Sequence, residues 1–128
     1  MVFDNFQIDC NGEITGHGSD QNGNFELKGI YKCENLSIQN EVCKDPIWII
    51  KVYTTSKNTK PCVYNGRFCV NGSFSSSIQG NWWFTNSTDL LEEIAANVSK
   101  INKGSFEITN FCFKEWKGSN SNFPNNTC

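Results

Sequence analysis

The histidine His17 is the first side chain to consider for catalysis, because imidazole is the usual general base at neutral pH. It is the one histidine of the chain, and Asp20 follows three residues later and could orient it. A general base also needs a nucleophile within reach, and the sequence contains no strained nucleophile motif such as G-x-S-x-G. We therefore predict a solvated histidine in a glycine-rich turn, no catalytic residues and no enzyme activity.

Metal binding finds little support in the residue spacing. With one histidine and no C-x-x-C pair, the chain lacks the usual ligand pattern of a structural zinc site. The run Asp20-Gln-Asn22-Gly-Asn24 resembles the start of a calcium loop, but Phe25 stands where an EF-hand requires glycine, and the twelfth position is not glutamate. We predict no metal site and no cofactor.

The seven cysteines favour disulfides, and therefore an oxidising compartment. The segment from Cys62 to Cys69 contains Asn65-Gly66, a pair that suits a two-residue hairpin turn. Such a turn would place the two cysteines opposite each other with Cα atoms about 5.5 Å apart, within disulfide range. We predict this bridge, with a hairpin carrying two reduced cysteines as the alternative.

The remaining cysteines extend the disulfide prediction. Cys112 is the proposed partner of Cys128, which would tie down the polar tail of residues 118–128. Because the count is odd, one cysteine is left free or bonded to another chain. The predicted disulfide-forming residues are Cys62, Cys69, Cys112, Cys128, Cys33 and Cys43.

Glycosylation signals agree with an oxidising compartment. Asn-x-Ser/Thr acceptor sequences begin at Asn35, Asn71, Asn86, Asn97 and Asn125. The first residues have neither a basic region nor an apolar core typical of a signal peptide. We predict a secreted glycoprotein, extracellular or lumenal, whose leader is absent from this sequence; a protein made and kept in the cytoplasm is the alternative.

Trp82 and Trp83 are the candidate binding residues. Adjacent residues of a strand point to opposite faces, so the two rings cannot share one core. Trp83, together with the nearby amides of Gln79 and Asn81, could form a stacking platform for a sugar ring or a partner protein. The alternative places Trp83 under a helix or under the C-terminal tail.

Alternating apolar and polar residues predict a mainly β protein. Strands are expected around Phe25, over residues 47–55 and 73–85, and over residues 104–116 with a bulge near Asn110. One helix is expected after Asp89, with an apolar stripe reaching Ile101. The expected fold is an antiparallel up-and-down β-barrel, or a strongly curved meander, of six to eight strands with one short helix before the last strand.

The order of short motifs resembles a known module. Residues 14–29 have the form I-x-G-x-G-x-D-x-x-G-x-F-x-L-x-G, and K-x-Y, Y-x-G, I-x-G-x-W and G-x-F follow in order. This pattern resembles a small β-barrel module of many protist proteins, and it is similar to the calycin meander of lipocalins and avidin-like proteins. The resemblance implies a scaffold or interaction module without established chemistry. Its structural positions here are Gly16, Gly18, Asp20, Gly23, Phe25, Gly29, Tyr53, Gly66 and Gly80.

The motif glycines have physical roles to play. Gly16, Gly18 and Gly23 would let a strand end, turn and restart, with Asp20 accepting hydrogen bonds from backbone amides in the turn. Glycines 29 and 80 would leave room for neighbouring aromatic rings. The seven cysteines and the helix depart from the module's pattern, which puts a cytosolic role in doubt.

Composition and charge narrow the function further. A formal net charge of −2 offers no basic excess for nucleic acid, and no apolar stretch is long enough to span a membrane. We expect one β-barrel domain over residues 1–117 that self-assembles or binds a protein partner as a structural module. The alternative is a calycin-like protein for a small apolar ligand or glycan. The expected interior side chains would already fill a narrow barrel: Phe25, Tyr31, Trp48, Phe74 and Trp82.

Overall fold

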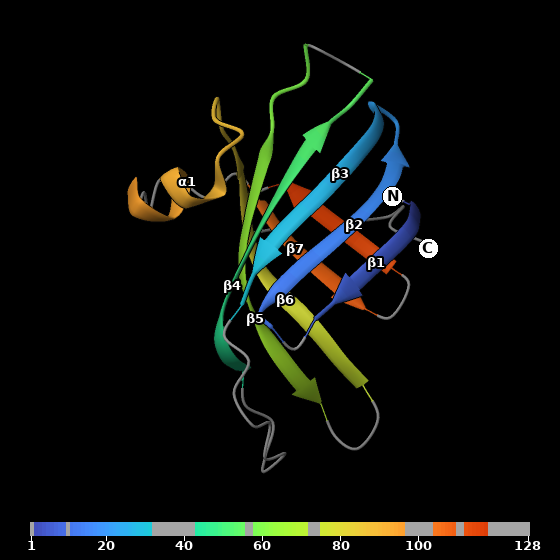
Figure 1. Ribbon diagram of the computed structural model, residues 1–128. Helices are drawn as coiled ribbons and strands as arrows, with labels where there is room; N and C mark the ends of the chain where they lie inside the picture. Colours follow the sequence, from blue (N-terminus) through green and yellow to red (C-terminus); the bar gives the residue numbers. More distant parts are fainter. Residues whose placement is uncertain are drawn as a thin grey trace.

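The computed structural model describes residues 2–9, 11–31, 43–55, 58–71, 75–96, 104–109 and 112–117. Eight strands and one helix follow each other along the chain (Figure 1). They are β1 (Val2–Ile8), β2 (Glu13–Asp20), β3 (Gly23–Ile30), β4 (Cys43–Tyr53), β5 (Cys62–Asn71), β6 (Ser75–Phe84), α1 (Leu90–Ala96), β7 (Gly104–Thr109) and β8 (Cys112–Lys117).

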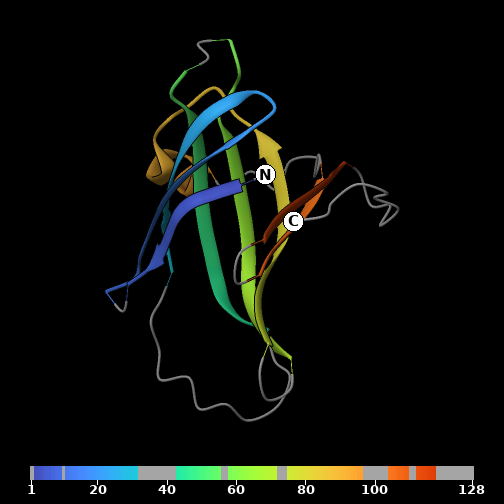
Figure 2. The same ribbon diagram turned by 90° about the vertical axis from the view of Figure 1, so that its right-hand side faces the viewer.

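All eight strands form one antiparallel sheet in which each strand pairs with the next along the chain. The sheet curls into a half-barrel, as the two perpendicular views show (Figures 1 and 2). The order begins with β1 and ends with β8, so these two strands are the edges, and they approach each other. The predicted mainly β, curved meander with one short helix is confirmed.

Strand β4 shows why the sheet has two different faces. Ile47 and Ile49 lie in the main core on the inner face, whereas Ile50 packs in a second cluster on the outer face. Trp48 belongs to the outer cluster, so its expected place among the interior side chains is wrong. The cause is the period of two along a strand, which separates Trp48 from the inward-facing odd-numbered residues.

The helix α1 covers the outer cluster. Asp89 caps it, since its Oδ1 accepts a hydrogen bond from the backbone N–H of Leu91 at 3.0 Å. Leu90 packs against the outer cluster of Ile50, Val63 and Trp83. The expected apolar stripe continues to Ile101, but residues 97–103 lie outside the described residues.

The predicted hairpin at Asn65-Gly66 is wrong. Strand β5 runs without interruption from Cys62 to Asn71, and Gly66 pairs with Gly80 of β6. Seven residues of extended strand separate Cys62 from Cys69 by about 23 Å, far beyond disulfide range. Cys62 is a buried free thiol. The predicted bridge between these two cysteines is therefore excluded.

Gly66 allows β5 and β6 to approach each other closely and does not form a turn. A Cβ there would come within 2.4 Å of the Gln79 carbonyl oxygen and 2.9 Å of Phe106 Cζ. At Gly80 a Cβ would lie only 2.1 Å from the Asn65 carbonyl oxygen. At both glycines the room is thus taken by backbone of the neighbouring strand, and at Gly66 the ring of Phe106 also comes close.

Two other segments differ from the expected structure. Gly16 and Gly18 lie inside β2, and the turn falls after Asp20, where Gly23 has a φ of 125°. The strand expected over residues 104–116 is two strands, β7 and β8, with Thr109 paired to Cys112. The predicted bulge near Asn110 lies outside the described residues.

Several predicted features lie outside the described residues. These are the tail of residues 118–128, Phe74, Cys33, Cys128, and the glycosylation acceptors Asn35, Asn97 and Asn125. Within the described part of the chain, no helix has the length and apolar character needed to cross a bilayer.

Candidate functional site

A buried lysine lies on the inner face of the half-barrel. Lys51 lies on β4 and is 1% exposed. Its Nζ lies 3.2 Å from Oδ2 of Asp20, at the end of β2, and 3.0 Å from Oε1 of Glu115 on the edge strand β8. Burying an ammonium group is costly unless it is paired, and two carboxylates pair this one. We refer to Asp20, Lys51, Tyr53, Tyr64 and Glu115 as the Lys51 cluster.

Two tyrosines complete the Lys51 cluster. The Tyr53 hydroxyl donates a hydrogen bond to Oδ2 of Asp20 at 2.5 Å. The hydroxyl of Tyr64, from β5, donates to Oε1 of Glu115. Each carboxylate therefore accepts from the ammonium group and from one phenol, and such charge-assisted hydrogen bonds are stronger than neutral ones.

Aromatic rings surround the ammonium group on its remaining sides. Lys51 Nζ lies 5.2 Å from the ring centre of Phe25 and 5.1 Å from that of Tyr53. The rings of Tyr64 and Phe113 lie at 5.7 and 6.0 Å. At these distances the ring faces attract a cation, and this attraction offsets part of the cost of removing the charge from water.

Burial and neighbouring charges together determine the protonation states of the Lys51 cluster. Burial lowers the pKa of Lys51, but the interactions with Glu115, Cys62 and Tyr53 together more than offset this, so the lysine pKa lies above its ordinary value. Burial raises the pKa of Tyr53 to about 12, against the opposing Lys51 charge. The pKa of Tyr64 is raised by burial and by Glu115. At neutral pH the phenols are therefore protonated donors and the lysine is charged.

The thiol of Cys62 lies beside the cluster and is not activated by it. Burial raises its pKa to about 11, although the Lys51 charge opposes the rise. A thiol becomes a good nucleophile when its pKa is depressed, so Cys62 is an inert buried group.

The Lys51 cluster joins parts of the sheet that are far apart in the sequence. It connects the β2–β3 turn, the central strands β4 and β5, and the edge strand β8. Among the described residues no buried side-chain nitrogen or oxygen lacks a hydrogen-bond partner. A fully satisfied network of this kind holds strands in position.

Asp20 has both an expected and an unexpected role. Its Oδ1 accepts a hydrogen bond from the backbone N–H of Asn22 at 2.8 Å, as predicted for the turn. Its Oδ2 reaches Lys51 and Tyr53, which the sequence interpretation missed. A signal existed, because Lys51 interrupts the apolar alternation of Ile47, Ile49 and Tyr53 on one strand face.

His17 occupies a different place from the one predicted. It lies inside β2, not in a turn, and its Nδ1 is 3.6 Å from Oδ2 of Asp4 on the edge strand β1. Its side chain is 55% exposed. Asp20 is three residues away along an extended strand and points into the Lys51 cluster, so it does not orient the imidazole.

The two candidate binding tryptophans are both buried. Trp82 lies in the inner core, and Trp83 lies in the outer cluster. Trp83 meets Trp48 edge-on, with ring centres 6.0 Å apart, and Leu90 of α1 packs on the same cluster. This is the covered position that the sequence left as the alternative to a stacking platform.

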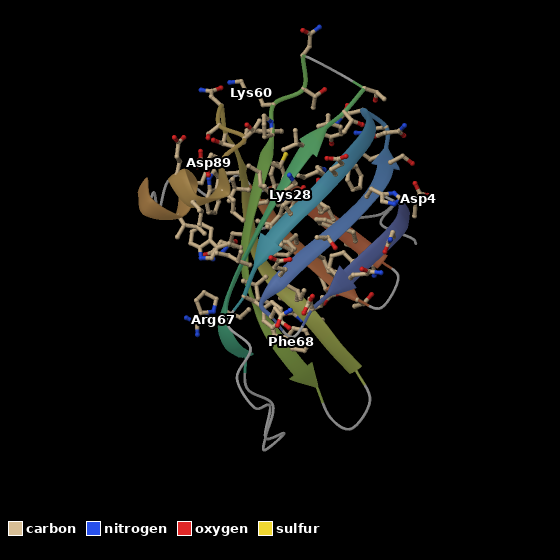
Figure 3. All side chains as sticks on the ribbon, viewed as in Figure 1. Asp4, Lys28, Lys60, Arg67, Phe68 and Asp89 are labelled. Atoms are coloured by element: carbon tan, nitrogen blue, oxygen red, sulfur yellow. The ribbon has the colours of Figure 1, made fainter. Side chains whose placement is uncertain are left out.

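The end of the half-barrel away from the Lys51 cluster holds a small open pocket lined by apolar side chains together with two hydroxyl side chains. Its volume is about 170 Å³. Figure 3 shows Phe68, one of its residues, at the end of the sheet opposite Lys60. We call it the Phe68 pocket; its lining residues are Phe6, Ile8, Phe68, Ser77, Ile78, Ile108 and Thr109.

The remaining candidate residues are scattered over the described sheet. Asn86 is exposed between β6 and α1, and Asn71 is the last residue of β5. Cys112 is the first residue of β8. Within the described ranges, no three or more His, Cys, Asp or Glu side chains gather in a way that could hold a metal ion.

Comparisons of the chain with protein-family models, with curated proteins and with solved structures find no match. The resemblance to the β-barrel module therefore remains an expectation carried by the sequence motifs alone.

Proposed function

We propose that this chain is a non-enzymatic structural module whose copies join through the two edges of the half-barrel. The observation that carries the proposal is the strand order, in which β1 and β8 are each hydrogen-bonded to one other strand only among the described residues. An edge strand presents unpaired backbone donors and acceptors, which another strand can satisfy.

The charges of the two edges favour contact between β1 of one copy and β8 of the next. Strand β1 carries Asp4, whose side chain is 63% exposed, and no basic residue. Strand β8 carries Lys114 and Lys117, with its one carboxylate, Glu115, turned inward to Lys51. Opposite charges on two edges favour a head-to-tail contact, which can repeat and build a larger assembly.

The geometry of β1 limits where such a contact can form. Its pairing to β2 shifts register between Phe3 and Asn5. A bulge of this kind weakens an edge as a pairing template. Regular pairing with a second copy is therefore expected over residues 5–8, next to Asp4.

The filled interior supports a structural role over catalysis. The charged groups of the Lys51 cluster pair with each other, and the neighbour of His17 is the exposed carboxylate of Asp4. We extend the proposal to an extracellular or lumenal setting, in which the exposed Asn86 is an N-glycosylation site.

The test is sedimentation velocity of the full chain over a concentration series. We expect reversible association that weakens as salt is added. Asp4→Lys and Lys114→Glu should each weaken association, and the double variant should restore it. Each variant's fold is checked by circular dichroism. A wild-type chain that stays monomeric throughout, or a double variant that does not recover, would refute the proposal.

The Phe68 pocket favours one second candidate, a small apolar ligand. Its volume of about 170 Å³ is below the ~300–1,000 Å³ of ordinary ligand sites. An apolar cavity of roughly 150 Å³ can hold benzene or xenon. Native mass spectrometry of the purified chain, followed by benzene titration, tests this: binding lost in Ile108→Phe supports it, and no binding by the wild type removes it.

A further inference from the structure

Two cysteines lie opposite each other in the sheet. In the pairing of β4 with β5, Cys43 is the direct partner of Cys69. These residues are 26 positions apart in the sequence, and the sequence analysis paired Cys69 with Cys62 and gave Cys43 no specific partner. The register brings them together because β5 is one long strand that runs back along β4 to the start of that strand.

We propose that Cys43 and Cys69 form a cross-strand disulfide. Directly opposed residues in an antiparallel pair have Cα atoms about 4.5 or 5.5 Å apart, depending on the hydrogen-bonding pattern at that position. Disulfides span Cα separations of about 4.4–6.8 Å, so either pattern is compatible with the bond. Opposed residues also project to the same face of a sheet.

The chemistry requires an oxidant of the disulfide class. Oxidised glutathione accepts the two electrons: one cysteine thiolate attacks its disulfide, and one glutathione thiol leaves. The second cysteine thiolate then attacks the mixed disulfide, which forms the protein S–S bond and releases the second glutathione thiol. The inference rests on the oxidising compartment of the proposed function, and it does not depend on association between copies.

The bond would join two central strands on the Phe68 side of the sheet. Next to it, the pairing of β4 with β5 shifts register between Lys44 and Pro46. Proline lacks the N–H that the ladder uses, so pairing is weakened there. A covalent link beside this irregularity would keep β4 and β5 in register at that end.

Peptide mapping tests the link directly. The full chain, produced without glycosylation, is refolded in a glutathione redox buffer, alkylated, and digested with trypsin and a glutamate-specific protease. Cleavage after Glu41, Lys44, Arg67 and Glu92 separates the cysteines at 33, 43, 62 and 69. The expected product is peptide 42–44 joined to peptide 68–92. Alkylated Cys43, or Cys43 joined to any other peptide, would overturn the proposal.

Thermal unfolding supplies an independent measurement. Cys43→Ser and Cys69→Ser should each lower Tm by roughly 10 °C, and the double variant should fall no further, because both remove one bond. Reductant should lower the wild-type Tm to the same level. Cys62→Ser is the matched control and should retain the linked peptides. Additive losses in the double variant would contradict the link.

Loss of this bond and loss of association are separable outcomes. The peptide map reports on covalent pairing within one chain, and sedimentation reports on contact between chains. A chain with the link that remains monomeric refutes only the proposed assembly. A chain that associates without the link refutes only the disulfide.

Discussion

The inner face of the half-barrel is filled by different kinds of side chain at its two ends. At one end the inner face is closed by the Lys51 cluster, in which one ammonium group, two carboxylates and two phenols satisfy each other. At the other end the Phe68 pocket is lined mostly by apolar side chains and keeps about 170 Å³ of space. A charged network fixes geometry because its partners are specific, whereas apolar contacts tolerate small shifts.

We infer that the polar end fixes the curvature of the sheet, whereas the apolar end tolerates small shifts of its side chains. Glu115 on the edge strand β8 reaches Lys51 in the centre of the sheet, so the polar end fixes where that edge lies. The apolar end has no comparable link among the described side chains, and Ile8 there is 41% exposed.

Lys51→Met should be the most destabilising change. It keeps the length of the side chain but leaves the carboxylates of Asp20 and Glu115 without their shared cation. Removing one partner from a buried ion pair costs about 3–5 kcal/mol. Urea unfolding measures the loss. Lys28→Met, on an exposed position of β3, is the matched control and should change stability by under ~0.5 kcal/mol. A loss below about 1 kcal/mol for Lys51→Met would show that the cluster does not tie the sheet.

Ile108→Ala should have the largest effect at the apolar end. Ile108 is 4% exposed, and truncation of such a side chain costs about 2–4 kcal/mol, less where the surroundings can collapse into the space. The double variant with Lys51→Met should come within about 1 kcal/mol of the sum of the two losses, because the two positions are coupled only through a neighbour such as Phe113, which pairs with Ile108 and lies 6.0 Å from Lys51 Nζ. Strong non-additivity in urea unfolding would mean that the two ends form one unit.

Alkaline pH should destabilise the polar end selectively. The folded-state pKa values of Lys51, Tyr53, Tyr64 and Cys62 all lie above their ordinary values, so the folded chain holds more protons than the unfolded chain. Their contribution to stability is complete below about pH 9 and is lost as pH rises toward 12. The rise of the Cys62 pKa from 9.0 to about 11 corresponds to about 2–3 kcal/mol of this loss.

Urea unfolding at a series of pH values checks this expectation. Cys62→Ala should flatten the curve between pH 9 and 11, whereas Ile108→Ala should shift it down without changing its slope. Stability that stays constant or rises over this range would contradict the burial of these groups in the folded chain.

Short-range patterns predicted much of the fold. Alternation located β3, β4 and β6, and it merged β7 with β8 into one expected strand. Asp89 and Asp20 were placed correctly as a helix cap and a turn acceptor. The Asn65-Gly66 pair misled, because glycine serves both tight turns and close strand approach, and local sequence does not distinguish the two. Its actual role depends on Gly80 and Phe106, which lie in later strands.

The Lys51 cluster could be predicted only in part, for a similar reason. A lysine on an apolar strand face signals a buried charge, but its partners are set by the curl of the whole sheet. Asp20 is 31 residues away in sequence and Glu115 is 64. The pairing of Cys43 with Cys69 likewise follows from strand register, which a single misplaced turn had changed.

His17→Ala should have the smallest effect on stability. The imidazole and the Asp4 carboxylate are 55% and 63% exposed at a separation of 3.6 Å. Exposed pairs of this kind contribute about 0–1 kcal/mol, so urea unfolding should show little change. Asp4 also carries the charge proposed for contact between copies, so removing its neighbour should alter the association constant by less than about threefold, whereas Asp4→Lys should weaken it strongly. A large loss of stability in His17→Ala would instead place this histidine in the framework that fixes edge strand β1.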